Sequence, residues 1–297
     1  MIKIDLERNI YLDELFIKRC IKTCVRRFKS IRDIKEGGSM CKKIDRIGEK
    51  TFNNFGSEMI IKEYRKYKDI DVYFPEYDWT AKNKSYKDFK RGEIKCPYEP
   101  RYYGKGYLGE GKYKMSENGK LKREYLIWYG MLKRCYDPKY QKKYPTYKGC
   151  KVEEYLLNFQ HMCKWLEENY YEVPDEVMCL DKDILCKGNK IYSSEICIFV
   201  PQRINLLFTK CGRSRGKNPI GVCESSSGNY EVRCRNEHGK YIYLGTYSTE
   251  EEAFRVYKQC KEKVIKEVID EYEGKIPEPY YSRLKEAMYN YKVEIDD

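Results

Sequence analysis

The stretch between residues 221 and 272 constrains the fold most, because its apolar residues change from a period of two to a helical period. In its first half, apolar and polar residues alternate in three short runs, with turn-forming segments at Gly228 and Asn229 and at residues 236–239. The alternating apolar residues are Val222, Val232, Cys234, Ile242 and Leu244. We therefore expect a three-stranded sheet with one apolar face.

A helix is expected directly after these strands. The Ser248-Thr249 pair offers an N-cap, with Glu251 and Glu252 in the first turn. Apolar residues then recur at helical spacing at Ala253, Val256, Tyr257, Cys260, Val264 and Val268. Such a helix would cover the apolar face of the sheet and leave the opposite, arginine-bearing face in solvent.

The same segment resembles the AP2/ERF family of DNA-binding domains over roughly forty residues. The resemblance lies in the Gly-Val start at residue 221, the Gly-Asn-Tyr turn, the Tyr-Leu-Gly-Thr-Tyr strand end and the Thr-Glu-Glu-Glu-Ala helix start. In that family the sheet enters the major groove, which implies double-stranded DNA as the partner of an AP2-like domain over residues 220–272. The implied DNA-contacting residues are Arg233, Arg235, Lys240, Tyr241 and Tyr243.

Arginine suits this task because its guanidinium can bond a guanine edge bidentately or clamp a phosphate. Where the family usually carries arginines on the first strand, this chain has Cys223 and Ser225. The resemblance therefore leaves base readout from that strand open, and a small structural module with solvated arginines is the alternative.

Charge also favours a polyanionic partner. With 59 Lys and Arg against 47 Asp and Glu, the formal net charge is +12, which favours polyanions through counterion release. AT-rich codons are an alternative source of part of this basicity and of the 31 tyrosines. Residues 201–219 hold five basic residues and no acidic one. In the linker at residues 211–219, Arg213, Arg215 and Lys217 could follow phosphates or enter a minor groove, and a solvated linker is the alternative.

No apolar run approaches the roughly 18 residues that span a bilayer, and the N-terminus lacks a signal-peptide pattern. We therefore predict a cytoplasmic protein, in the host-cell cytoplasm if a phage encodes it, without a membrane partner. The 14 cysteines form no Cys-x-x-Cys pair, which indicates reduced and mostly buried thiols rather than a zinc ribbon or a disulfide framework.

Three segments precede the central block. Residues 1–44 are expected to be helical, as a basic arm on DNA, an oligomerisation helix or a docking helix. Residues 45–100 alternate apolar residues with turn-formers and resemble a module common in phage and mobile-element proteins, which predicts a small SH3-like β-barrel. Residues 101–120 are glycine-rich without a phosphate-binding motif, and they predict a flexible linker.

The central block, residues 121–210, resembles phage-type HNH endonuclease-like proteins over about ninety residues. That fold is a ββα unit that holds one metal ion, with a histidine that activates water, and its hairpin would here run from Leu180 to Phe199. The only histidines, His161 and His238, lie outside this hairpin. Asp181, Asp183 and Asn189 could bind a hard cation. We expect a non-catalytic scaffold without a cofactor; Mg²⁺ or Mn²⁺ is implied only if the block is a nuclease.

The C-terminal tail, residues 273–297, contains apolar residues at helical spacing that suit packing onto the chain's own domains or onto a second subunit. The candidates for a protein interface are Tyr280, Tyr281, Leu284, Met288 and Tyr291.

These features predict an α+β multidomain protein, phage- or prophage-derived by resemblance, in which each small domain has its own core. The favoured function is a DNA-binding regulator or accessory protein, alone or as a homo-oligomer. One alternative is a metal-dependent nicking endonuclease. Another is a phage counter-defence protein that binds and inhibits a host nuclease or defence complex.

Overall fold

The computed structural model describes residues 45–209 and 217–295. Apart from Asp45, these residues belong to one compact unit, residues 46–297. The helical segment predicted over residues 1–44 lies outside the described residues, as do Arg213 and Arg215 of the basic linker. The described chain is a mixed α+β structure with two hydrophobic cores.

The first core is built on an antiparallel meander in which strands adjacent in sequence pair in the order β1-β2-β3-β4. Ser85 caps the helix that follows, and Gly92 ends it in a left-handed conformation. The elements are β1 (Lys50–Phe52), β2 (Glu58–Lys66), β3 (Asp69–Phe74), the 3-10 helix η1 (Pro75–Tyr77), β4 (Trp79–Lys84) and α2 (Tyr86–Arg91).

The SH3-like barrel predicted here is not closed, since within the described residues no sheet forms a barrel. Beyond β4 the chain enters α2, whose Tyr86 and Phe89 pack on Met59, Val72 and Phe74 in the same core. A helix therefore covers the apolar face that a closing strand would otherwise bury.

The glycine-rich segment at residues 101–120 is packed and hydrogen-bonded, which corrects the prediction of a flexible linker. The amide of Tyr107 donates to the Leu157 carbonyl over 3.1 Å, and the amide of Tyr113 donates to the Gln160 side chain over 3.0 Å. A Cβ on Gly106 would lie 2.3 Å from a methyl carbon of Leu132. This glycine therefore permits close approach to the second core instead of supplying flexibility.

The second core contains the central block. Trp128 and Leu132 of α3 and Phe159 and Met162 of α6 are buried in it. The elements are β5 (Ser116–Glu117), β6 (Lys120–Leu121), α3 (Arg123–Tyr136), α4 (Pro138–Lys143), η2 (Pro145–Tyr147), β7 (Lys151–Val152), α5 (Glu154–Leu157), α6 (Phe159–Asn169), β8 (Met178–Asp181), β9 (Ile191–Tyr192), β10 (Ile198–Pro201) and α7 (Gln202–Leu207).

In the segment predicted as a hairpin, Leu180 to Phe199, the first and last strands pair. Strands β8 and β10 pair antiparallel, with Leu180 directly opposite Phe199, and α7 follows at once. Strand β9 lies between β8 and β10 and pairs with β7 in another sheet, so the local order is strand, strand, strand, helix.

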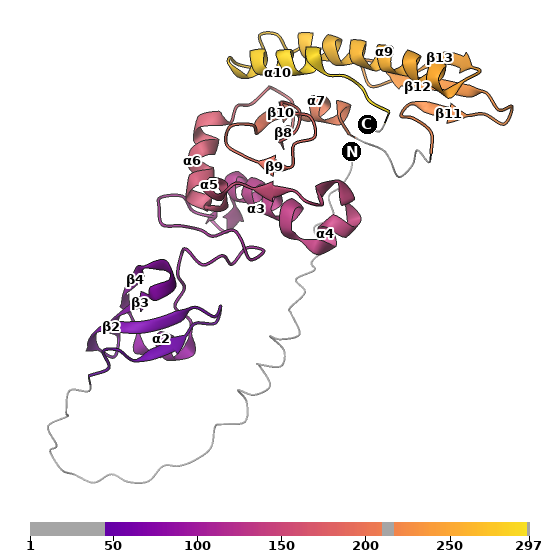
Figure 1. Ribbon diagram of the computed structural model, residues 1–297. Helices are drawn as coiled ribbons and strands as arrows, with labels where there is room; N and C mark the ends of the chain where they lie inside the picture. The colour runs from indigo at the N-terminus through magenta and orange to yellow at the C-terminus, as the bar shows by residue number, and fades with distance from the viewer. Residues whose placement is uncertain (1–44, 210–216, 296–297) are drawn as a thin grey trace, which may run out of the picture. The chain divides into compact units, whose positions relative to one another are not determined.

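The three-stranded sheet and helix predicted near the C-terminus are confirmed. They consist of β11 (Val222–Glu224), β12 (Tyr230–Arg235), β13 (Tyr241–Tyr247) and α9 (Glu250–Asp270), and α10 (Tyr280–Asn290) packs against α9 (Figure 1). Their buried residues belong to the same core as the central block. The two segments were predicted as domains with separate cores, whereas the structure gives them one.

The tail packs onto the chain's own core, which is one of the two arrangements that its spacing allowed. Tyr281, Leu284 and Met288 are buried, whereas Tyr280 and Tyr291 are partly buried against the same core. In this arrangement the three buried side chains are inaccessible to a protein partner. Within the described residues, none of the helices is long and apolar enough to cross a membrane.

Candidate nucleic-acid interface

The β12–β13 ladder places the predicted DNA-contacting residues in cross-strand pairs. Arg233 lies opposite Tyr243, and Arg235 lies opposite Tyr241. The register shifts between Val232 and Arg233. Val232 pairs with Gly245 while Arg233 pairs with Tyr243, so Leu244 of β13 has no partner in the ladder. This bulge bends the strand at Gly245, whose φ of +124° favours glycine. The two Arg–Tyr pairs therefore share one face of the sheet.

The two faces of the sheet differ sharply in exposure. Val222, Val232 and Cys234 are at most 2% exposed and belong to the core that contains α9. On the opposite face, Tyr241 is 69% exposed and Tyr243 is 60% exposed. The alternation in the sequence therefore predicted correctly which residues face the core and which face solvent.

Helix α9 closes the inner face through local features of its sequence. The Thr249 hydroxyl accepts the Glu252 amide as an N-cap, and Ala253, Val264 and Val268 are buried against the core. At the start of β11, Gly221 has a φ of +77°, and a Cβ there would lie 2.0 Å from the Tyr257 ring. Only glycine therefore lets the first strand approach the helix so closely.

The outer face presents cations that are already oriented by their neighbours. The Arg235 guanidinium lies 4.7 Å from the Tyr241 ring centroid and donates to its hydroxyl over 3.2 Å. Arg233 forms an exposed ion pair of 3.1 Å with Glu231. Both contacts are exposed to solvent, so their energies are small, but they limit the rotamers that each guanidinium samples.

The remaining candidates lie around this face. The Lys240 side chain is exposed at the β12–β13 turn, which is held by the Asn236 carboxamide oxygen accepting the Lys240 amide over 2.9 Å. Lys217 is exposed in the turn before β11. On the first strand, Cys223 is exposed and lies opposite Glu231 of β12. At this position the sheet therefore presents a thiol and a carboxylate instead of a cation.

In the central block, the candidate cation ligands hold a loop together. The Asp181 carboxylate accepts the amides of Asp183 and Ile184 over 2.8 and 2.7 Å. The Asn189 carboxamide donates to the carbonyls of Lys182 and Ile191. Burial, followed by the neighbouring Asp183 carboxylate, raises the pKa of Asp181 to about 6.

These groups do not fit a divalent-ion site. The buried Lys182 ammonium lies 3.0 Å from the Asp183 carboxylate and supplies the positive charge that a metal would bring. In the described part of the chain, no group of three or more His, Cys, Asp or Glu side chains is arranged to hold a metal. His161 stacks on Tyr155 with ring centroids 4.7 Å apart, and His238 lies 3.3 Å from the Glu237 carboxylate.

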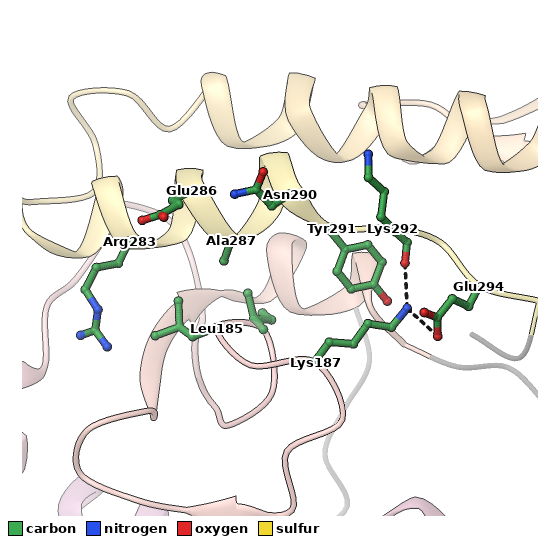
Figure 2. A pocket seen from close by; sticks show the side chains of 10 residues that line it. Leu185, Lys187, Arg283, Glu286, Ala287, Asn290, Tyr291, Lys292 and Glu294 are labelled. Carbon is green, nitrogen blue, oxygen red and sulfur yellow. Dashed lines mark hydrogen bonds and ion pairs between the residues drawn. The ribbon is translucent and has the colours of Figure 1, made fainter.

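A groove of about 540 Å³ lies between α10 and the loop that follows β8 (Figure 2). The Lys187 ammonium donates to the Lys292 carbonyl over 2.7 Å and pairs with the Glu294 carboxylate at 3.2 Å across this groove. Arg283 donates to the Glu195 carbonyl over 2.8 Å. The basic groups that line the groove are therefore engaged within the chain and do not favour one class of ligand.

A second basic surface was not among the predicted sites, because charge was counted over the whole chain and over residues 201–219 alone. Residues 133–151 contain seven basic residues and one acidic residue. A count in short windows would have found this segment, which forms α4, η2 and their flanks.

A comparison with protein-family models, with curated proteins and with solved structures finds no match. The function of the chain is therefore inferred from its own residues.

Proposed function

We propose that this chain binds double-stranded DNA through the outer face of its β11–β13 sheet. The observation that carries the proposal is the exposure of Arg233, Arg235, Tyr241 and Tyr243 together on one face, while α9 covers the other. The resemblance of this segment to AP2/ERF domains agrees with the same assignment.

The dimensions of the sheet suit the major groove. A major groove about 12 Å wide admits a two-stranded ribbon. Arg233 and Arg235 are two residues apart on β12, which separates them by about 7 Å along the strand, and this distance is close to two base-pair steps of about 3.4 Å. Each guanidinium can therefore reach a different base pair or phosphate.

Glu231 limits the strength of the interaction. Its carboxylate pairs with Arg233 in the free protein, so a phosphate or a guanine edge must replace this partner when DNA binds. Because the pair is exposed, it is weak, and a polyanion can displace it. We infer that binding is electrostatic in large part and that the first strand contributes little base readout.

A regulatory or accessory role fits these features better than the alternatives. A nicking enzyme would need a base and a metal site. Asp181 instead accepts amides of its own loop, and Asp183 pairs with the Lys182 ammonium. The counter-defence alternative relies on apolar residues of the tail and of the segment from Tyr11 to Phe28. Three of the tail residues are buried in the chain's own core, and the N-terminal segment lies outside the described residues.

The test is a gel-shift titration of a random-sequence duplex pool with the Arg233→Ala/Arg235→Ala variant. We expect a loss of roughly 2–6 kcal/mol in binding free energy, taking about 1–3 kcal/mol for each contact. The control, Arg91→Ala/Lys263→Ala, removes two exposed cations elsewhere and should bind like the parent. An unchanged shift with the sheet variant would refute the assignment.

A further inference from the structure

The basic surface on α4 and its surroundings carries a high positive charge. We name it the lysine lobe and define it as residues 133–151 together with Lys190. Residues 133–151 carry a net charge of +6, half of the +12 of all 297 residues.

The fold gathers lysines from two separate segments onto this lobe. The Lys190 ammonium donates to the Thr146 carbonyl over 2.8 Å, and the Lys151 amide donates to the Lys190 carbonyl over 2.8 Å. Lys143, Lys148, Lys151 and Lys190 are all exposed. Among the described residues, no carboxylate forms an ion pair with any of these four.

A cluster of tyrosine rings in tilted contact lies beside the lysines. The Tyr140 ring lies 4.7 Å from that of Tyr144 and 5.8 Å from that of Tyr147. The Lys133 and Lys143 ammoniums lie 5.5 and 5.2 Å from the rings of Tyr140 and Tyr144. Such contacts reduce the side-chain entropy that the lysines would lose on binding.

One of the seven basic residues within residues 133–151 of the lobe, Arg134, is partly buried. The Nε of Arg134 donates to the Tyr192 hydroxyl over 2.9 Å, and its guanidinium carbon lies 5.4 Å from that ring. Within the described residues no carboxylate pairs with it. Its charge therefore adds to the positive potential of the surface above it.

We propose that the lysine lobe is a second, sequence-independent contact for the phosphate backbone of double-stranded DNA. Lysine ammoniums act as point charges that neutralise phosphates without reading bases. Protein interfaces are depleted in lysine and need an apolar centre, whereas the large apolar side chains exposed here are Tyr144 and Ile191. A nucleic acid backbone therefore fits the lobe better than an acidic protein does.

This proposal rests on the proposed function only because both name double-stranded DNA as the ligand. The lobe can contact DNA whether or not the β11–β13 sheet does. The test replaces Lys143, Lys148, Lys151 and Lys190 with glutamine in the full chain. The matched control replaces Lys66, Lys68, Lys87 and Lys95, four exposed lysines of the first core region, with glutamine.

Binding of a 20-base-pair duplex is measured by fluorescence anisotropy across a salt series. Each lost phosphate contact lowers the slope of log K against log salt by about 0.9, so the lobe variant should lose up to about 3.6. The control variant should keep the slope of the parent. A parental slope in the lobe variant, or an equal loss in the control, overturns the proposal.

The Arg233→Ala/Arg235→Ala variant in the same series separates the two assignments. If the lobe variant alone loses slope, the lobe contact stands and the sheet assignment fails; if the sheet variant alone loses slope, the lobe proposal fails. Poly-glutamate binding that is lost in the lobe variant while its DNA slope is unchanged would point to an acidic protein and overturn the proposal. If the fourfold variant does not fold, Lys148→Gln and Lys190→Gln should each lower the slope by about 0.9.

Discussion

Replacing Asp181 with asparagine tests whether this buried carboxyl serves the fold or serves chemistry. Its pKa is raised from an ordinary 3.8 to about 6. Between pH 3.8 and about 6, the carboxyl is therefore protonated in the folded state and ionised in the unfolded state. The stability of the fold therefore falls as pH rises from about 4 to about 6. Two pKa units correspond to about 3 kcal/mol, which is the upper limit of the unfavourable contribution above pH 6.

Asparagine keeps the oxygen that accepts the amides of Asp183 and Ile184 but cannot ionise. Asp181→Asn should therefore match the parent at pH 4 and exceed it by up to about 3 kcal/mol at pH 8. Urea denaturation followed by circular dichroism at both pH values measures the difference, with the exposed Glu195→Gln as a control. A variant that is less stable than the parent at pH 8 would refute the reasoning.

Three further changes test the packing and the absence of catalysis. Gly221→Ala should lower the free energy of unfolding in urea by about 1–3 kcal/mol, because the added Cβ meets the Tyr257 ring. Gly228 is the control position, since its φ is a similar +79° but a Cβ there meets nothing within 4 Å. Gly228→Ala therefore reports the backbone strain alone in the same urea titration. Leu284→Ala should lose about 2–5 kcal/mol, whereas a loss near zero would show that α10 does not need to stay packed. Supercoiled plasmid incubated with Mg²⁺ or Mn²⁺ should remain intact on agarose gels, and nicking that disappears in Asp181→Asn would instead support the endonuclease.

The C-terminal sheet and helix could be predicted from sequence because local patterns determine them. The alternation that placed Val232 in the core and Arg233 in solvent is a property of one strand, and the Thr249 cap is a property of one turn. The pairing of Leu180 with Phe199 was instead expected from the resemblance to HNH-like proteins, because these residues are 19 apart in the sequence. Features that are determined by about ten consecutive residues could therefore be predicted from the sequence.

Features that depend on contacts between residues far apart in the sequence could not be predicted from the sequence. Gly106 looked like part of a flexible linker because its close neighbours, Trp128 and Leu132, are more than twenty residues away in sequence. The first sheet could be predicted to stay open only from the knowledge that α2 folds back over it. Tyr281 could have faced a partner or the chain's own core, and periodicity alone cannot choose between two apolar surfaces.

The lysine lobe differs from these cases, because its signal was present in the sequence. Seven basic residues within residues 133–151 are visible by inspection. The contribution of Lys190 was not, since it comes from the loop before β9 and reaches the lobe through its bond to Thr146.

The central claim, that the outer face of the β11–β13 sheet contacts DNA, is tested most directly by site-specific crosslinking. A photoreactive p-benzoylphenylalanine is placed at Tyr241, whose exposed ring lies on this face, or at Lys263, which is exposed on α9. Each protein is irradiated with a labelled duplex at a concentration that saturates binding. We predict a crosslinked product from position 241 and none from position 263. Saturated binding without a crosslink at position 241, or a crosslink only at position 263, would contradict the account.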